Sequence, residues 1–251
     1  MQQELTPGEV VLVGGGPGDP DLLTVAGLRA VRQADVVVHD RLGPVSSLNE
    51  VNPGAELVNV GKIPRGAFTP QEEINAILID RAKRGQRVVR LKGGDSFVFG
   101  RGGEEWQACA EAGVPVRVIP GVTSAVAVPA LAGVPVTHRT LSQGFTVVSG
   151  HVPPGDPRSQ LDWHALARTS TTLVLLMAVK CLPEITAALI DGGLPATTPA
   201  AIVADGSTPA QRSWTATLAD IAAVAEESGV RPPAIVVIGD VAGLGLGDAS
   251  A

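Results

Sequence analysis

Short runs of β-branched and other apolar residues alternate along the chain with stretches of helical periodicity. Such runs are typical of buried strands in α/β proteins with mixed, mainly parallel sheets. The pattern therefore predicts an α/β fold with about five strands in each half. The strands expected in the first half are Val10–Val13, Asp35–Val38, Glu56–Val60, Arg87–Leu91 and Val116–Ile119. Those expected in the second half are Phe145–Ser149, Thr172–Met177, Ala200–Ala204, Gln211–Thr215 (the weakest) and Ala234–Ile238.

Helix signals fall between these runs. Thr69 is a candidate cap, Pro70 suits the first position of a helix, and Gly85 marks its end. Two further helices are expected over Asp21–Gln33 and Thr217–Ser228. The predicted elements thus alternate between strand and helix.

A crossing between two domains is predicted at Pro120–Ser124, a turn-rich stretch with Pro129 and Pro135 beyond it. This boundary divides the chain into an α/β domain over residues 1–120 and a second α/β domain over residues 121–251. A chain of 251 residues is long enough for two such domains, each with its own core. The halves share no obvious period, so no internal repeat is expected.

Composition and charge narrow the class of function. Hydrophobic residues make up 45% and charged residues 18% of the chain, as in folded globular proteins. Aromatic residues make up only 3%, with no Tyr, so base-stacking platforms are not expected. The net charge of −6 argues against a nucleic-acid partner, because general affinity for phosphates needs clustered cations.

Membrane, secretion and metal signals are weak. The longest apolar run, Leu173–Val179, is far shorter than the roughly 20 residues that span a bilayer. Met1–Glu9 lacks the basic and apolar pattern of a secretory signal, so a cytoplasmic protein without membrane contact is expected. Cys109 and Cys181 have no companions at ligand spacing, which predicts two buried thiols and no metal site.

Unusual residues follow the predicted strands, where ligands bind in open α/β sheets. The fourth strand is followed by Lys92–Glu105, in which five of fourteen residues are Gly. Gly14-x-Gly16 fails as a Rossmann fingerprint because Asp19 stands at its third glycine position. Gly61–Lys62 lacks the remainder of a phosphate-binding loop, and no Gly-x-Ser-x-Gly occurs. The glycine-rich run therefore predicts a ligand loop of another kind.

Six stretches together resemble the tetrapyrrole methylase family. They are Val13–Thr24, Ala34–Leu42, Val89–Glu105, Pro120–Ala125, Gly133–Arg139 and Gln211–Arg212. The run that ends in Gly-Arg-Gly-Gly-Glu-Glu is specific to this family. The Gly-Pro-Gly-Asp-Pro loop also suits diphthine and ribosomal-RNA methylases of the same superfamily. The similarity extends over roughly Val10 to Val241.

This resemblance implies two α/β domains with a cleft between them that binds S-adenosyl-L-methionine and releases S-adenosyl-L-homocysteine. It also implies a homodimer. Carried over position by position, the residues that contact the methyl donor are Pro17, Gly93, Gly94, Asp95, Val98, Thr123, Ser124, Met177 and Gly206. By the same carry-over, Asp40 is the proton acceptor and Lys62 the proton donor. The implied substrate is a tetrapyrrole with several carboxylates, which arginine and lysine side chains suit. The candidates for that contact are Arg41, Arg65, Lys92, Arg101, Arg139 and Arg212.

Two departures from the family pattern lie in these stretches. Ser96 stands where Pro is usual, and Leu176–Met177–Ala178 stands where Tyr-Met-Gly is usual. Ser96 is expected to loosen a turn without removing a ligand. Ala178 adds a side chain and the Tyr hydroxyl is missing, so the expected effect is on donor affinity more than on reaction type.

The implied reaction is C-methylation of uroporphyrinogen III at two pyrrole carbons, C2 and C7. It gives precorrin-2 for cobalamin or sirohaem biosynthesis. Alternatives are methylation of a later corrin precursor, methylation of a macromolecule, or donor binding without catalysis. Each residue also has a structural interpretation. An Asp after a strand is often a turn former or cap, a loop Lys is often only solvated, and charges such as Arg101 can serve a helix start.

Overall fold

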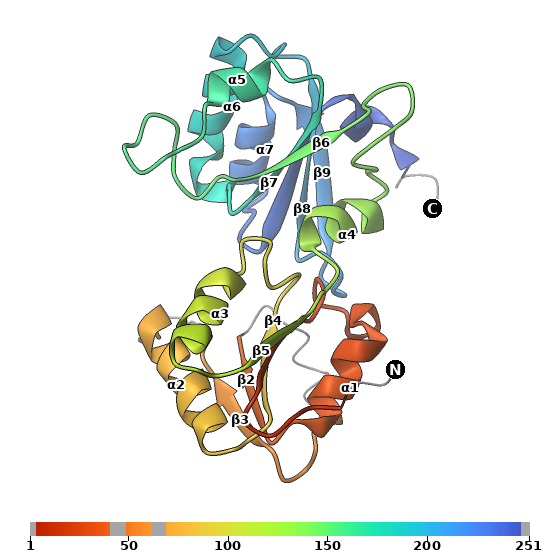
Figure 1. The fold of residues 1–251 in the computed structure, drawn as a ribbon. Coiled ribbons are helices and arrows are strands. Elements are labelled where there is room, and N and C mark those ends of the chain that lie inside the picture. The colour runs from red at the N-terminus through yellow and green to blue at the C-terminus, as the bar shows by residue number, and fades with distance from the viewer. Residues whose placement is uncertain (1–3, 41–48, 62–68, 247–251) are drawn as a thin grey trace. The chain divides into compact units, whose positions relative to one another are not determined.

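The computed structural model describes residues 4–40, 49–61 and 69–246, and the chain divides into two compact units (Figure 1). The N-terminal unit comprises residues 1–123 and the C-terminal unit residues 124–251. Sequence reasoning placed the boundary after residue 120. Each unit builds one five-stranded sheet with its own core.

The sheet of the N-terminal unit is parallel throughout, with strand order β3-β2-β4-β1-β5. Its strands are β1 (Val10–Gly14), β2 (Val36–His39), β3 (Glu56–Asn59), β4 (Val88–Lys92) and β5 (Val116–Ile119). Its helices are a 3-10 helix (Pro20–Leu22), α1 (Val25–Gln33), α2 (Gln71–Lys83) and α3 (Gly102–Glu111). The predicted α/β class is confirmed here, and every connection that contains a helix returns to a parallel strand.

Helices cover both faces of this sheet because successive strand residues point to opposite sides. Val11 and Val13 of β1 pack with α1, whereas Val10 and Leu12 pack with α2 and α3. The central strand β1 is therefore apolar on both faces, which is why it appears in the sequence as a continuous apolar run.

The C-terminal unit has a mixed sheet with strand order β6-β7-β10-β8-β9. Its strands are β6 (Phe145–Ser149), β7 (Thr172–Leu176), β8 (Pro199–Ala204), β9 (Arg212–Thr217) and β10 (Ala234–Ile238). Its helices are α4 (Ser124–Leu131), α5 (Trp163–Ala167), a 3-10 helix (Val179–Cys181), α6 (Leu182–Asp191), α7 (Ile221–Glu227) and a 3-10 helix (Asp240–Gly243).

Mainly parallel pairing was expected in both halves, but in this second sheet only β6 and β7 pair in parallel among the described strands. The physical reason lies in the connections. No helix separates β8 from β9, so they form an antiparallel pair, and β10 runs antiparallel to β7 and β8 between them.

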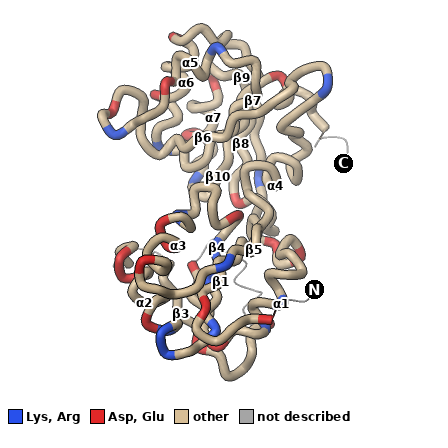
Figure 2. Tube along the Cα trace, in the orientation of Figure 1, with Lys and Arg blue, Asp and Glu red and all other residues tan. Residues whose placement is uncertain are grey.

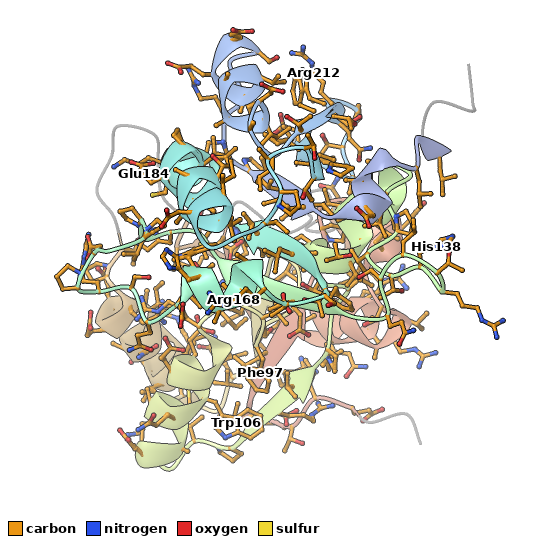
Figure 3. All side chains as sticks on the ribbon, turned by 90° about the horizontal axis from the view of Figure 1, so that it is seen from above. Phe97, Trp106, His138, Arg168, Glu184 and Arg212 are labelled. Carbon is orange, nitrogen blue, oxygen red and sulfur yellow. The ribbon has the colours of Figure 1, made fainter. Side chains whose placement is uncertain are left out.

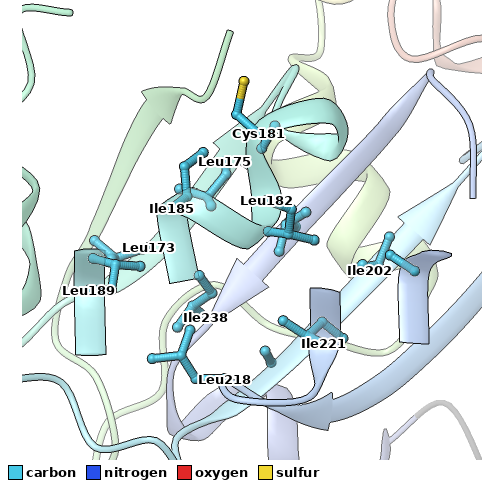
Figure 4. Close-up of a cluster of buried hydrophobic side chains, with 14 of the residues drawn as sticks. Leu173, Leu175, Cys181, Leu182, Ile185, Leu189, Ile202, Leu218, Ile221 and Ile238 are labelled. Carbon is cyan, nitrogen blue, oxygen red and sulfur yellow. The ribbon is translucent and has the colours of Figure 1, made fainter. Parts of the chain in front are cut away.

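Two apolar layers pack on the two faces of the second sheet. One layer comes from α5, α6 and α7, and Figure 4 shows Ile185 and Leu189 of α6 among the sheet residues Leu173 and Leu175. The other layer comes from α4 and the 3-10 helix at Asp240–Gly243. Packing on both faces again matches the apolar strand runs.

All ten predicted strands are present within two residues of their expected limits, but three helices begin later than predicted. The first begins at Val25, because Thr24 Oγ1 caps it by accepting from Gly27 N at 3.0 Å. The second begins at Gln71 with Pro70 in the cap position, and no side chain there caps it. Residues up to Thr217 belong to β9, so the third starts at Ile221.

The structure also bears on the sequence predictions about membrane helices, surface charge and cysteines. None of the helices in the described ranges has both the length and the apolar character needed to cross a bilayer. Along the described trace, Lys and Arg are interspersed with Asp and Glu in both units (Figure 2). Cys109 and Cys181 are buried free thiols, as predicted.

Candidate functional site

The loops after β1, β4 and β5 meet at the carboxyl edge of the N-terminal sheet, because these strands are neighbours in the order β4-β1-β5. Gly16 N donates to Gly94 O at 3.1 Å, and Gly94 N donates to Gly16 O at 2.6 Å. Gly15 N donates to Lys92 O at 2.7 Å. The first two loops thus form one continuous backbone surface.

Glycine is required where these loops touch. A Cβ on Gly14 would lie 2.5 Å from Gly121 N and 2.8 Å from Gly94 O. A Cβ on Gly121 would lie 2.5 Å from Gly14 C and would overlap Gly94 O. Backbone packs directly on backbone here, which other residues do not permit. Sequence reasoning noted both loops but did not assign Gly14 or Gly121 to the site. The available signal was a glycine at or just after the end of a strand.

Asp95 connects two of the loops through both oxygens of its carboxylate. Oδ1 accepts from Phe97 N at 2.8 Å, and Oδ2 accepts from Gly121 N at 3.0 Å. Each oxygen retains a further lone pair for another donor. Asp95 therefore holds the loop after β4 against the loop after β5, beside any contact it makes to a ligand.

Gly94 is buried, but four other donor candidates of the N-terminal unit reach the surface. Pro17, Gly93 and Thr123 are partly exposed. Val98 is 36% exposed, and it follows Phe97, whose ring lies 6.1 Å from that of Trp106 on α3 (Figure 3). The loop after β4 thus presents an accessible apolar side chain next to the glycine turn.

Asp40 lies at the end of β2 beside a buried group of charges. Its Oδ2 is 3.5 Å from a terminal nitrogen of Arg90, and its side chain is 24% exposed. Arg90 and Lys92 both pair with Glu105, at 3.0 Å and 2.8 Å. Burial lowers the pKa of the Lys92 ammonium, Arg90 acts in the same direction, and Glu105 opposes them. Lys92, predicted to grip substrate carboxylates, has an internal anion as its partner.

Arg101 occupies the cap position of α3 in the left-handed region, with φ of 57°. Its Nε lies 3.2 Å from Glu104, and both side chains are about half exposed. Glu104 and Glu105 are neighbours in the first turn of α3. The structure separates them, since Glu105 is fully buried.

In the C-terminal unit, three donor candidates lie at element ends. Met177 follows β7 with φ of 58° and is 49% exposed, so it is not core filler. Gly206 follows β8, where a Cβ would lie 2.6 Å from Val128 Cγ2. Ser124 opens α4.

The five described non-glycine residues with positive φ all follow β4, β7 or β8, and such strain concentrates at functional sites. They are Phe99, Arg101, Met177, Asp205 and Ser207.

The departure at Ala178 has a structural explanation. Its side chain is fully buried in the core under α6, and a Cβ on Gly150 would lie 2.5 Å from Ala178 Cβ. The added methyl group therefore fills the core. Leu176 is also buried, within the layer that packs on α4.

Two of the remaining substrate candidates lie on the C-terminal unit. Arg139 is exposed in the segment that precedes β6. Arg212 is exposed at the start of the edge strand β9, with its guanidinium 4.8 Å from the centre of the Trp214 ring. Arg41, Lys62 and Arg65 lie outside the described residues.

Ser96, which stands where the family usually has Pro, is expected to lower the stability of the protein. Its side chain is fully buried, and its Oγ finds no hydrogen-bond partner among the described residues. A buried polar atom without a partner is destabilising. Ser96→Ala is therefore expected to raise the free energy of unfolding by about 1 kcal/mol. Thermal denaturation should show a rise in Tm of about 2–4 °C.

Ser142→Ala is the matched control for this prediction. Ser142 is also buried, but its Oγ donates to Gly144 O at 2.8 Å and accepts from Thr172 N and Thr172 Oγ1, both at 3.0 Å. The same substitution is expected to lower Tm there. Equal falls in Tm for both variants would show that Ser96 Oγ contributes to stability.

Known proteins resemble this chain in sequence and in fold. The model of the tetrapyrrole (corrin/porphyrin) methylases matches residues 9–222. An S-adenosyl-L-methionine-dependent uroporphyrinogen III methyltransferase from Methanosarcina barkeri is 46% identical over 234 residues, covering 93% of this chain and 92% of the relative.

A siroheme synthase from Thiobacillus denitrificans is 47% identical over 234 residues, covering 93% of this chain and 48% of the relative. The chain thus spans about half the length of such curated relatives. Among solved structures, the uroporphyrin-III C-methyl transferase of Thermus thermophilus in complex with S-adenosyl homocysteine is 41% identical with a TM-score of 0.78. It covers 93% of this chain and 92% of its own.

The resemblance drawn from the six sequence stretches is thereby confirmed, because the matched family region includes every one of them. The fold also agrees with that of a solved relative at a TM-score of 0.78. This chain belongs to the tetrapyrrole (corrin/porphyrin) methylases.

Proposed function

We propose that this chain transfers methyl groups from S-adenosyl-L-methionine to C2 and C7 of uroporphyrinogen III, giving precorrin-2. The observation that carries the proposal is the 46% identity to the Methanosarcina barkeri methyltransferase over nearly the whole of both chains. The Thermus thermophilus relative, solved with S-adenosyl homocysteine, supports the choice of donor.

The residues assigned to the methyl donor fit such a ligand. The contact between Gly14, Gly94 and Gly121 gives a backbone surface without intervening side chains, which lets a ligand approach closely. Asp95 keeps lone pairs for the polar groups of the donor. Val98 and Met177 each expose an apolar side chain. Pro17, Gly93, Thr123, Ser124 and Gly206 complete the proposed set.

Bound S-adenosyl-L-methionine would supply an electrophilic methyl group, which a pyrrole β-carbon attacks as the carbon–sulfur bond breaks and S-adenosyl-L-homocysteine leaves. The protein has to align the substrate and manage one proton for each transfer. Asp40 is the proposed proton acceptor because its carboxylate is partly exposed at the carboxyl edge of the sheet. Lys62 is the proposed proton donor.

Substrate carboxylates are assigned to arginines, whose planar guanidinium binds carboxylates in pairs of hydrogen bonds. The described candidates with substantial exposure are Arg101, Arg139 and Arg212. Arg41 completes the proposed set. Lys92, held by Glu105 in the interior, is assigned a role in the buried cluster.

The product of the proposed reaction would serve sirohaem or cobalamin biosynthesis, in keeping with the names of the relatives. A cytoplasmic location and a homodimer are parts of the same proposal.

Incubation with uroporphyrinogen III and S-adenosyl-L-methionine tests the proposal. Mass spectrometry is expected to show a product with two added methyl groups, which disappears when the donor is omitted. If that substrate gains no mass while a later corrin precursor does, the chain is a sister methylase. If neither gains mass while donor binding persists, the protein binds the donor without acting on a tetrapyrrole.

A further inference from the structure

The buried charges beside Asp40 lie on a single face of the N-terminal sheet. Along β4, Val88 packs with α2 and α3, while Val89 and Leu91 pack with α1. Because strand side chains alternate, Arg90 and Lys92 point to the same side as Val88. Two cations thus interrupt an otherwise apolar layer at the carboxyl end of β4.

Glu105 of α3 lies at the centre of this group. It is fully buried, and its Oε1 accepts from Arg90 Nε at 3.0 Å and from Lys92 Nζ at 2.8 Å. Gln71 Nε2 of α2 lies 3.4 Å from the same oxygen. Charges in the interior are costly unless they are paired. Among the described residues, this cluster together with Asp40 contains two anions and two cations.

Arg90 is the part of the cluster that reaches Asp40. Its Nε is held by Glu105, and its Nη1 donates to Leu91 O at 3.0 Å and to Val38 O at 3.4 Å. Because the guanidinium is planar and rigid, these contacts also fix the position of Nη2. That nitrogen lies 3.5 Å from Asp40 Oδ2. A side chain only 4% exposed therefore presents one nitrogen to a carboxylate that is 24% exposed.

We infer that Arg90, anchored by Glu105, is a positioning residue that holds the Asp40 carboxylate where it accepts the substrate proton. The inference rests on the proposed function, in which Asp40 is that acceptor. Arg90 itself touches neither the substrate nor the donor in this role. It acts through the position of Asp40, so its loss should affect turnover through that residue alone.

A second arginine–aspartate pair on the same two strands provides a control. Asp35 precedes β2 and Arg87 precedes β4, so both lie at the amino ends of these strands, and they pair at 2.6 Å. The hydrogen bonds from Arg87 lower the pKa of Asp35. This pair joins the same strands but lies far from their carboxyl ends, so it should matter for stability alone.

The test is a double-mutant cycle between Arg90→Met and Asp40→Asn, with kcat measured for methylation of uroporphyrinogen III. In the wild-type background, Arg90→Met is expected to lower kcat by about 10- to 100-fold, as for a misplaced reacting group. In the Asp40→Asn background, the same change is expected to alter kcat by less than about twofold. Arg87→Met should leave kcat unchanged in both backgrounds while lowering Tm.

Equal losses of kcat from Arg90→Met in both backgrounds would overturn the positioning role, since a merely structural effect does not depend on Asp40. A wild-type protein that does not methylate uroporphyrinogen III would instead refute the proposed function. Wild-type kcat in Asp40→Asn would show that Asp40 is not the acceptor and leaves Arg90 nothing to position.

Removal of Arg90 alone leaves Glu105 with one fewer partner, so a charge-balanced variant guards against misfolding. Arg90→Met/Glu105→Gln removes one cation and one anion, and such replacements are often tolerated. It is expected to bind S-adenosyl-L-homocysteine in calorimetry within about threefold of wild type, because the donor loops are untouched. Its kcat should remain about 10- to 100-fold low. Wild-type kcat in this variant would overturn the inference.

Discussion

Gly121→Ala is expected to lower the free energy of unfolding by about 3 kcal/mol or more and to weaken S-adenosyl-L-homocysteine binding by on the order of 100-fold. The added Cβ would overlap Gly94 O and lie 2.5 Å from Gly14 C. All of these neighbours are backbone atoms, so no side-chain rotation can relieve the overlap. The loops after β1, β4 and β5 must move apart, and Gly121 N then withdraws from Asp95 Oδ2.

Denaturant unfolding and calorimetry measure the two effects. Gly103→Ala is the matched control, because a Cβ at Gly103 in α3 has no atom within 4 Å. Alanine in a helix is favoured over glycine, so this control should stabilise the protein by up to about 1 kcal/mol. Donor affinity in Gly121→Ala close to that of the control would show that the contact of the three loops is not part of the donor site.

Much of the fold is visible in the sequence because every strand except the edges is packed on both faces. The apolar runs therefore locate the strands to within two residues. Burial does not encode strand direction, however, and the antiparallel course of β10 depends on its insertion between β7 and β8. Helix starts were misplaced because more than one residue before a helix can act as its cap. Asp19 and Thr24 can both cap, and only packing decides that a 3-10 turn ends between them.

The candidate site was predictable to the extent that it follows strand ends. The rule that ligands bind at the carboxyl ends of strands singled out the loops after β1 and β4, and the structure brings these two loops together. The close approach of Gly14 to Gly121 depends on the order β4-β1-β5, which the sequence does not reveal. Arg90 and Lys92 were visible as charges two apart in a buried strand, but their partner Glu105 becomes evident only when α3 packs.

The second large effect is expected at Asp40. Asp40→Asn keeps the size of the side chain and leaves an oxygen that can accept from Arg90, but an amide does not take up a proton at neutral pH. Loss of a general base typically costs about 10²- to 10⁴-fold in kcat. The measurement is steady-state methylation of uroporphyrinogen III followed by mass spectrometry. S-adenosyl-L-homocysteine affinity should stay unchanged, because the donor loops follow other strands.

Asp35→Asn separates this chemical role from a structural one. Both aspartates flank β2. Asp40 contacts Arg90 of β4, and Asp35 contacts Arg87, the residue before β4. If Asp40 is only a turn former, the two substitutions should lower Tm by similar amounts and leave kcat near wild type. If Asp40 accepts the proton, kcat falls only in Asp40→Asn, while Asp35→Asn lowers Tm because Arg87 loses its anion. Because Asp35 and Asp40 stand at the two ends of β2, this pair of variants distinguishes proton transfer from a structural role.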